Sequence, residues 1–178
     1  MIDRPVSPPD VRRTFAELQA TLQPGELAPA LPLAVLIVDG QPLAMPYRVY
    51  YDQARLWTVV ARSDEAARSL ALGLGTRHWD GDVREACARL LLPSRDRWTP
   101  AFVACLLGEY VIEIIDVIAE AFDQLDAAAF ADFARANPAF MATTRRRATS
   151  YWNEHHRHRF PDRRAYPGLA ALDRIERR

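Results

Sequence analysis

The chain has 178 residues, of which 49% are hydrophobic and 26% are charged, a composition typical of globular proteins and unlike that of disordered ones. The 23 basic residues, all arginine, balance the 23 acidic residues, so no global attraction to nucleic acid or anionic lipid is expected. The length favours one domain over residues 1–178, with a helix and hairpin segment at 1–60 and a helical segment at 61–178.

The N-terminal segment combines a helix with a β-hairpin. The start signal Ser7-Pro8-Pro9-Asp10 and the apolar spacing after it predict a helix over about 9–22, followed by a proline-marked loop at 24–32. The apolar run 33–38, the turn pair Asp39-Gly40 and the strand-like residues 42–51 predict a hairpin whose second strand is an edge. Residues 52–60 are ambiguous, and a third strand over 56–60 is one alternative.

The rest of the chain has the apolar periodicity of helices. Start and stop signals predict helices over 64–74, from the Asp82 and Glu85 start to about 92, from Thr99-Pro100 to about 122, over 126–137, over 138–159 and near 167–175. The turn at 76–82 contains His78, for which we expect a structural role. Cys87 and Cys105 lie on apolar helix faces, which predicts buried, reduced thiols and favours a cytoplasmic location.

One stretch resembles a known architecture. Residues 80–91, DGDVREACARLL, resemble the second helix of a HEAT-like repeat, with an aspartate at the turn and a Val-Arg pair before an alanine and leucine face; the helix at 64–74 completes an antiparallel pair. The pattern PYRVYY, then TRHWDGDVRE and LLGEYVIEI, is also similar to an uncharacterised bacterial domain family with no known activity. The resemblance implies an interaction surface. The expected fold is mainly α, a HEAT-like or irregular helical bundle with an N-terminal β-hairpin.

A stripe of carboxylates marks the expected helix at 100–122. Glu109, Glu113, Asp116 and Glu120 follow one another at spacings of 4, 3 and 4 residues, which places them in a strip about 60° wide on an otherwise apolar helix. Like charges at this spacing repel, so the strip requires solvent, cations or a metal. A solvated groove face, pairing with arginines of the chain and a metal or catalytic site remain open.

The helix at 138–159 offers a partner for this stripe. Arg147, Tyr151, His155 and His158 share one of its faces, together with apolar and aromatic positions. We expect the guanidinium of Arg147 to bridge two carboxylates of the stripe, with a hydrogen bond from Tyr151. Replacement of Arg147 by alanine should then destabilise the protein more than the same change at either preceding arginine.

The function that these features favour is a cytoplasmic protein-interaction or scaffold module with an acidic groove and an unknown protein partner, a homo-oligomer being one form of it. A first alternative is a metal-dependent enzyme using Glu109, Glu113 and Asp116 with His155 or His158. A second is nucleic-acid binding by the arginine-rich region 141–178, which the zero net charge disfavours. We predict no catalytic residue, no resident metal, no cofactor and no membrane association.

Overall fold

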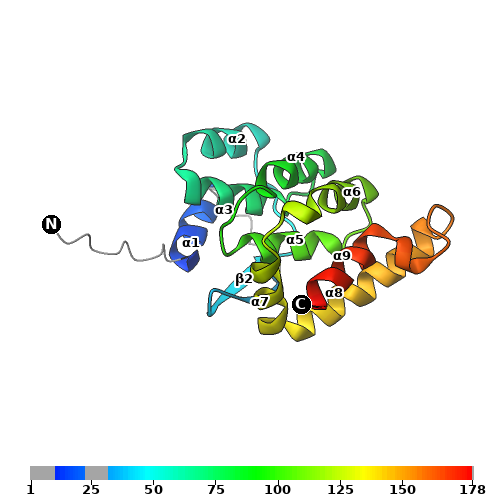
Figure 1. Ribbon diagram of the computed structural model, residues 1–178. Coiled ribbons are helices and arrows are strands. Elements are labelled where there is room, and N and C mark those ends of the chain that lie inside the picture. Colours follow the sequence, from blue (N-terminus) through cyan, green and yellow to red (C-terminus); the bar gives the residue numbers. More distant parts are fainter. Residues whose placement is uncertain (1–10, 23–31, 178) are drawn as a thin grey trace.

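The computed structural model describes residues 11–22 and 32–177 (Figure 1). Helices predominate in these residues, and a two-stranded antiparallel sheet lies near their N-terminal end. This confirms the mainly α fold with a hairpin. Buried apolar side chains from Phe15 to Ile175 form one hydrophobic cluster. The expected helix start at residues 9–10 and most of the loop at 24–32 lie outside the described residues.

The hairpin consists of β1 (Pro32–Val38) and β2 (Gln41–Pro46). Asp39 and Gly40 between them have φ values of 51° and 74°, the left-handed geometry that a two-residue type I′ turn requires. The predicted turn is therefore confirmed. The second strand ends at residue 46 rather than 51, because residues 47–51 leave the hairpin and run beside residues 77–79.

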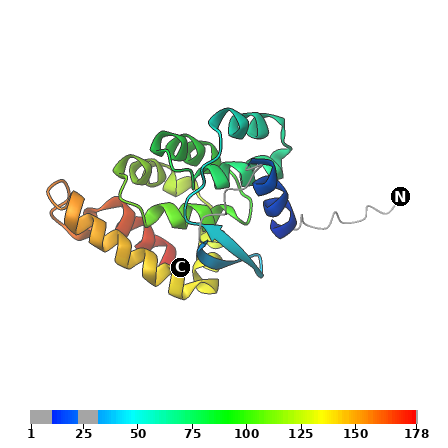
Figure 2. The same ribbon diagram turned by 180° about the vertical axis from the view of Figure 1, so that it is seen from behind.

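The side chain of Asn137 joins the hairpin to the helices. Its Oδ1 accepts a hydrogen bond from the amide of Ile37 at 2.7 Å, and its Nδ2 donates to the carbonyl oxygens of Ile37 and Phe133, both at 2.9 Å. The amide thus occupies the outer edge of β1 as a neighbouring strand would. The hairpin lies between α1 (Val11–Leu22) and α7 (Ala127–Ala136), as Figure 2 shows from behind.

Three helices after the hairpin begin at aspartate caps. They are α2 (Gln53–Arg62) after Asp52, α3 (Glu65–Gly75) after Asp64 and α4 (Gly81–Leu91) after Asp80, and each carboxylate accepts a hydrogen bond from the first helical turn. The residues left ambiguous by the sequence are therefore helical, and the alternative of a third strand is wrong. The cap of α4 is Asp80 rather than Asp82, because Asp80 accepts from the amides of residues 82 and 83.

The helices form two rows. In Figure 1, α2, α4 and α6 (Ile112–Ala121) follow one another along the upper edge, and α3 and α5 (Thr99–Leu107) lie below them. Contacts join α2 to α3, α3 to α4 and α5, and α4 to α6. The contact between α3 and α5 is close at Gly73, where an added Cβ would lie 2.4 Å from a ring carbon of Phe102.

The predicted single helix from 99 to 122 is wrong, because the chain leaves the helix between α5 and α6. The amides of Gly108 and Glu109 bond to carbonyls three residues earlier, which tightens the end of α5. Val111 is then extended, with φ −77° and ψ 104°, so α6 starts in a new direction. The break turns Glu109 away from the residues with which the helical stripe would have aligned it.

The C-terminal part is built from α8 (Pro138–Tyr151) and α9 (Pro167–Glu176), which pack on each other. Both contact α5, and α9 also contacts α6. Residues 152–156 continue α8 as one turn of π-helix, so the predicted regular helix over 138–159 is wrong in its last third. The wider turn directs His156 inward, where its Nε2 lies 2.9 Å from the carbonyl oxygen of Tyr110. Short 3-10 turns follow α6 at 122–124 and precede α9 at 163–165.

Candidate functional site

A buried ionic cluster lies where three chain segments meet. Glu109, only 2% exposed, accepts hydrogen bonds at Oε1 from Nη1 of Arg48 at 2.8 Å and from Nη1 of Arg77 at 2.7 Å. Its Oε2 lies 3.1 Å from Nε of Arg84, an ion-pair distance without hydrogen-bond alignment. Three guanidinium groups therefore share one carboxylate in a site largely closed to water. We call these four residues the ionic junction.

The arginines of the ionic junction also bind the backbone of the segments around them. Arg77 donates from Nε to the carbonyl of Pro46 at 3.2 Å and from Nη2 to that of Tyr47 at 2.7 Å. Arg84 donates from Nη1 to the carbonyls of His78 and Trp79 at 3.0 and 2.9 Å. Burial lowers the pKa of Arg84, and Glu109 opposes this effect by stabilising the cation. Segments 46–51, 76–80 and 108–111 are thus fixed to one another.

His78 fixes the turn between α3 and α4, as the sequence led us to expect. Its Nδ1 accepts a hydrogen bond from the amide of Asp80 at 3.1 Å, so the opposite nitrogen carries the proton and donates to the carbonyl of Tyr51 at 2.9 Å. A parallel bridge beside it joins Val49 to His78, with the amide of Trp79 donating to Val49 at 3.0 Å. Both ring nitrogens are therefore engaged in holding backbone, which leaves no free atom for proton transfer.

Exposed aromatic side chains surround the ionic junction. Tyr47, Trp79 and Tyr110 are 47%, 56% and 54% exposed, and each comes from a different one of the three joined segments. Tyr50, in the first segment, is also exposed. Tyr47 lies beside the guanidinium of Arg48, whose carbon is 5.2 Å from the ring centroid. The junction thus carries several large, flat side chains that the described fold does not bury.

The carboxylate stripe does not form one acidic groove. Glu109 lies in the ionic junction, whereas Glu113 and Glu120 are exposed on α6 and form no ion pair with a described residue. Asp116 pairs with Arg159 at 3.1 Å. Two members of the stripe, Glu109 and Asp116, do pair with arginines of the chain, as one of the open alternatives predicted. The predicted single groove along all four is wrong, because the break after α5 separates Glu109 from the other three.

Arg147 is not the partner of the stripe. It is half-buried on α8 and forms no ion pair or hydrogen bond with a described residue. Arg145 instead pairs with Asp173 at 2.7 Å and Glu176 at 2.8 Å, and these bonds hold the pKa of Asp173 below its usual value. The predicted ranking of alanine variants therefore reverses, and replacement of Arg145 should destabilise more than replacement of Arg147.

Two other side chains that the sequence placed on the same helix face as Arg147, those of Tyr151 and His155, form an aromatic group beside Tyr110. The ring of Tyr151 lies edge-on to Tyr110 with centroids 5.9 Å apart, and His155 stacks on Tyr151 at 6.2 Å. His158 is exposed beyond the π-turn and does not join this group. No set of three or more histidine, cysteine, aspartate or glutamate side chains in the described residues could hold a metal ion.

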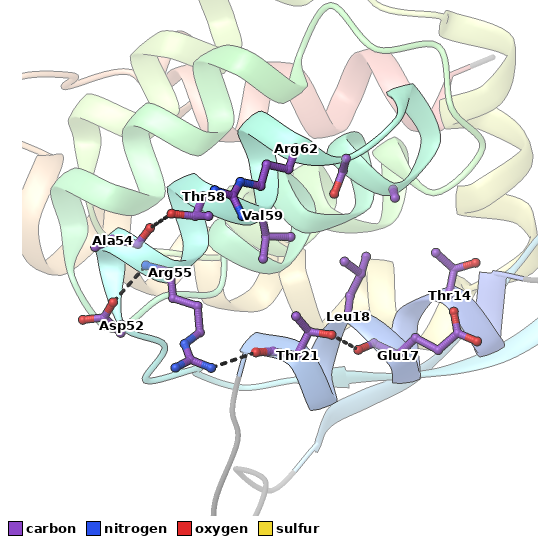
Figure 3. A pocket seen from close by; sticks show the side chains of 12 residues that line it. Thr14, Glu17, Leu18, Thr21, Asp52, Ala54, Arg55, Thr58, Val59 and Arg62 are labelled. Carbon is purple, nitrogen blue, oxygen red and sulfur yellow. Dashed lines mark hydrogen bonds between the residues drawn. The ribbon is translucent and has the colours of Figure 1, made fainter.

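A cleft of about 740 Å³ lies elsewhere, between α1 and α2 (Figure 3). Its size is that of a small-molecule site, but many of its polar groups bond to nearby backbone. The hydroxyls of Thr21 and Thr58 donate to carbonyls of their own helices, and Asp52 caps α2. The guanidinium of Arg55 spans the cleft to the carbonyl of Thr21 at 3.4 Å. These groups serve the helices rather than converge on a ligand.

Comparison of the chain with protein-family models, curated proteins and solved structures gave no match. Among the described helices none is long and apolar enough to cross a membrane. Sequence reasoning identified Glu109 and Tyr151 but missed Arg48, Arg77 and Arg84, because none of these three arginines belongs to a periodic pattern.

Proposed function

We propose that this protein is a protein-interaction module whose partner binds over the ionic junction. The observation that carries the proposal is the set of exposed aromatic rings from three segments that one buried ionic cluster holds together. Tyrosine and tryptophan are enriched among residues that dominate binding energy at protein interfaces. Because the backbone beneath these rings is fixed, binding costs less conformational entropy than it would for rings on mobile loops.

The HEAT-like resemblance is part of this proposal. It is supported by α3 and α4, which pack side by side across a short turn, and by the row of α2, α4 and α6 above α3 and α5. Stacked helix pairs commonly present interaction surfaces along a row of turns. Free, buried thiols at Cys87 and Cys105 support the further proposal that the protein works in the cytoplasm, where thiols stay reduced.

Charge pairing favours a protein partner over nucleic acid. In the arginine-rich C-terminal region, Arg145 and Arg177 pair with Asp173, and Arg159 and Arg174 pair with acids of α6 and the turn after it. These pairs neutralise charge that a phosphate backbone would otherwise attract. These four arginines therefore stabilise contacts within the chain.

The test is affinity capture with the immobilised protein from lysate, compared among three forms of the chain. The double variant Trp79→Ala/Tyr110→Ala removes the exposed rings, and Val35→Ala/Leu90→Ala removes exposed apolar side chains that lie in β1 and α4. Both must first show the circular dichroism spectrum of the wild type. We expect a stoichiometric partner that the first variant loses and the second retains.

Sedimentation of the purified protein precedes the capture, because a second copy of the chain is one form of partner. Self-association that Trp79→Ala/Tyr110→Ala abolishes would assign the surface to a homo-oligomer. Equal recovery of every partner by the two double variants, or no partner and no self-association in the wild type, would overturn the proposal.

A further inference from the structure

The ionic junction and the neighbouring Arg147 together carry an excess of positive charge. Arg48, Arg77 and Arg84 share the single carboxylate of Glu109, and Arg147 adds a fourth guanidinium that has no acidic partner among the described residues. Of these four cations, Arg77 and Arg84 are buried, whereas Arg48 and Arg147 are partly exposed. Glu113, three residues beyond Tyr110, is exposed and forms no ion pair with any of them. A half-buried guanidinium without a counterion is a favourable site for an external carboxylate.

Several independent contacts locate Arg147 beside the junction. One turn earlier on α8, Thr144 packs on the break after α5, where a Cβ at Gly108 would lie 3.3 Å from its Cγ2. One turn later, Tyr151 meets the ring of Tyr110. Burial raises the pKa of the Cys105 thiol on α5, and the positive charges of Arg77, Arg147 and Arg48 act against this rise. Arg147 therefore lies between two contacts with segment 108–111.

The aromatic rings continue from the junction across this arginine. Tyr110 meets Tyr151, which stacks on His155. A ligand on this surface would meet these flat rings together with the partly exposed guanidinium groups of Arg48 and Arg147. Flat rings accept apolar or aromatic side chains, and guanidinium groups accept carboxylates in a bidentate arrangement.

We propose that the partner binds through an acidic peptide segment, with carboxylates that pair with Arg147 and Arg48 and an apolar or aromatic side chain that packs on Tyr110 and Tyr151. This inference rests on the proposed function and adds the chemistry of the partner. An acidic peptide is favoured over a nucleic acid because the chain as a whole has no net positive charge.

The test uses two short fluorescein-labelled peptides of alternating acidic and aromatic residues, one with glutamate and tyrosine and the other with glutamine in place of glutamate. Binding is followed by fluorescence anisotropy at low and at physiological salt. We expect the glutamate peptide to bind, with an affinity that falls as salt rises, and the glutamine peptide to bind at least about tenfold more weakly.

Three single variants test the residues. Arg147→Gln should weaken the glutamate peptide about tenfold, the usual effect of losing one charge-assisted hydrogen bond. Arg146→Gln is the matched control on the same helix, because Arg146 is exposed and donates only to Thr143. It should leave the affinity unchanged. Glu113→Gln should tighten binding, since it removes a negative charge beside Tyr110.

Equal binding of the two peptides, or an Arg147→Gln variant with wild-type affinity, would overturn the inference. A single-stranded oligothymidine that binds more tightly than the glutamate peptide and is lost in Arg147→Gln would also overturn it, in favour of nucleic acid. The capture experiment distinguishes failure of this inference from failure of the proposed function. If the cellular partner is lost with Trp79→Ala/Tyr110→Ala but kept with Arg147→Gln, the interaction surface stands and only the acidic chemistry is wrong.

Discussion

The carboxylate of Glu109 faces three guanidinium groups and is almost completely withdrawn from water. A buried ion pair contributes little when compared with an apolar replacement, but removal of one partner leaves uncompensated charge. The role of Glu109 is therefore to make the burial of Arg77 and Arg84 possible. Through the carbonyls that these arginines bind, one carboxylate controls the placement of three chain segments.

Glu109→Gln should lower the free energy of unfolding by about 3–5 kcal/mol, because it leaves buried cations without a counterion. Urea unfolding followed by circular dichroism measures this loss. Glu113→Gln, which changes an exposed carboxylate nearby, should stay within about 0.5 kcal/mol of the wild type. Similar stabilities for the two variants would show that the cluster does not hold the segments together.

The two cysteines should be unreactive in the folded protein. Burial raises the pKa of Cys87 to about 12 and that of Cys105 to about 11, so very little thiolate exists at neutral pH. Labelling with a thiol-reactive disulfide at pH 8 should give no signal in buffer and two equivalents in urea. Rapid labelling of either thiol without denaturant would contradict the buried placement.

The same pKa shifts predict an alkaline limit of stability. The unfolded chain loses its thiol protons near its ordinary pKa, whereas the folded chain keeps them to higher pH. The contribution of each thiol is therefore complete below about pH 8.5 and is lost as pH rises through the folded values. Melting temperatures measured from pH 7 to 11 should fall above about pH 9, and a constant melting temperature would contradict this expectation.

At the scale of elements, the close packing of α3 on α5 requires a glycine, without a Cβ, at position 73. An added Cβ at Gly73 would lie 2.4 Å from the ring of Phe102, so either the ring or a helix would have to move. Alanine favours helix over glycine by about 1 kcal/mol, but overpacking costs about 1–3 kcal/mol. Close contact therefore outweighs helix propensity at this position.

Gly73→Ala should accordingly lower the melting temperature, as measured by thermal unfolding. Gly81→Ala is the matched control on α4, because its added Cβ would meet only Arg84 Nη2 at 3.8 Å. We expect the control to melt at or above the wild-type temperature. A stabilised Gly73→Ala variant would show that α3 and α5 separate more readily than their contact implies.

Local signals in the chain predicted most of the helices but not where they meet. The aspartate caps, the Asp39-Gly40 turn and the apolar periodicity each act within a few residues, so α3, α7 and the hairpin were foreseen. The break between α5 and α6 was missed, because the apolar pattern continues through it and the charge that stabilises it comes from distant arginines. Arg48 lies 61 positions before Glu109, and no local pattern joins them.

At the scale of the whole molecule, local sequence signals likewise predicted some residues of the candidate site but not their contacts. Glu109 and Tyr151 were selected for helical spacing, which placed them on one surface but gave them wrong partners. The exposure of Trp79 and Tyr110 depends on the fold, because His78 and Glu109, the polar residues that precede them in the chain, are buried instead. Tertiary contacts, rather than periodicity, therefore define the surface to which we assign binding.

Hydrogen exchange of the protein with and without its captured partner tests the central claim most directly. If the ionic junction supports the binding surface, backbone amides in segments 46–51, 76–80 and 108–111 should exchange more slowly in the complex. Amides along α1 and α2, which line the separate cleft, should exchange at their original rates. Protection confined to that cleft, with no change at the three joined segments, would contradict the assignment of function to the ionic junction.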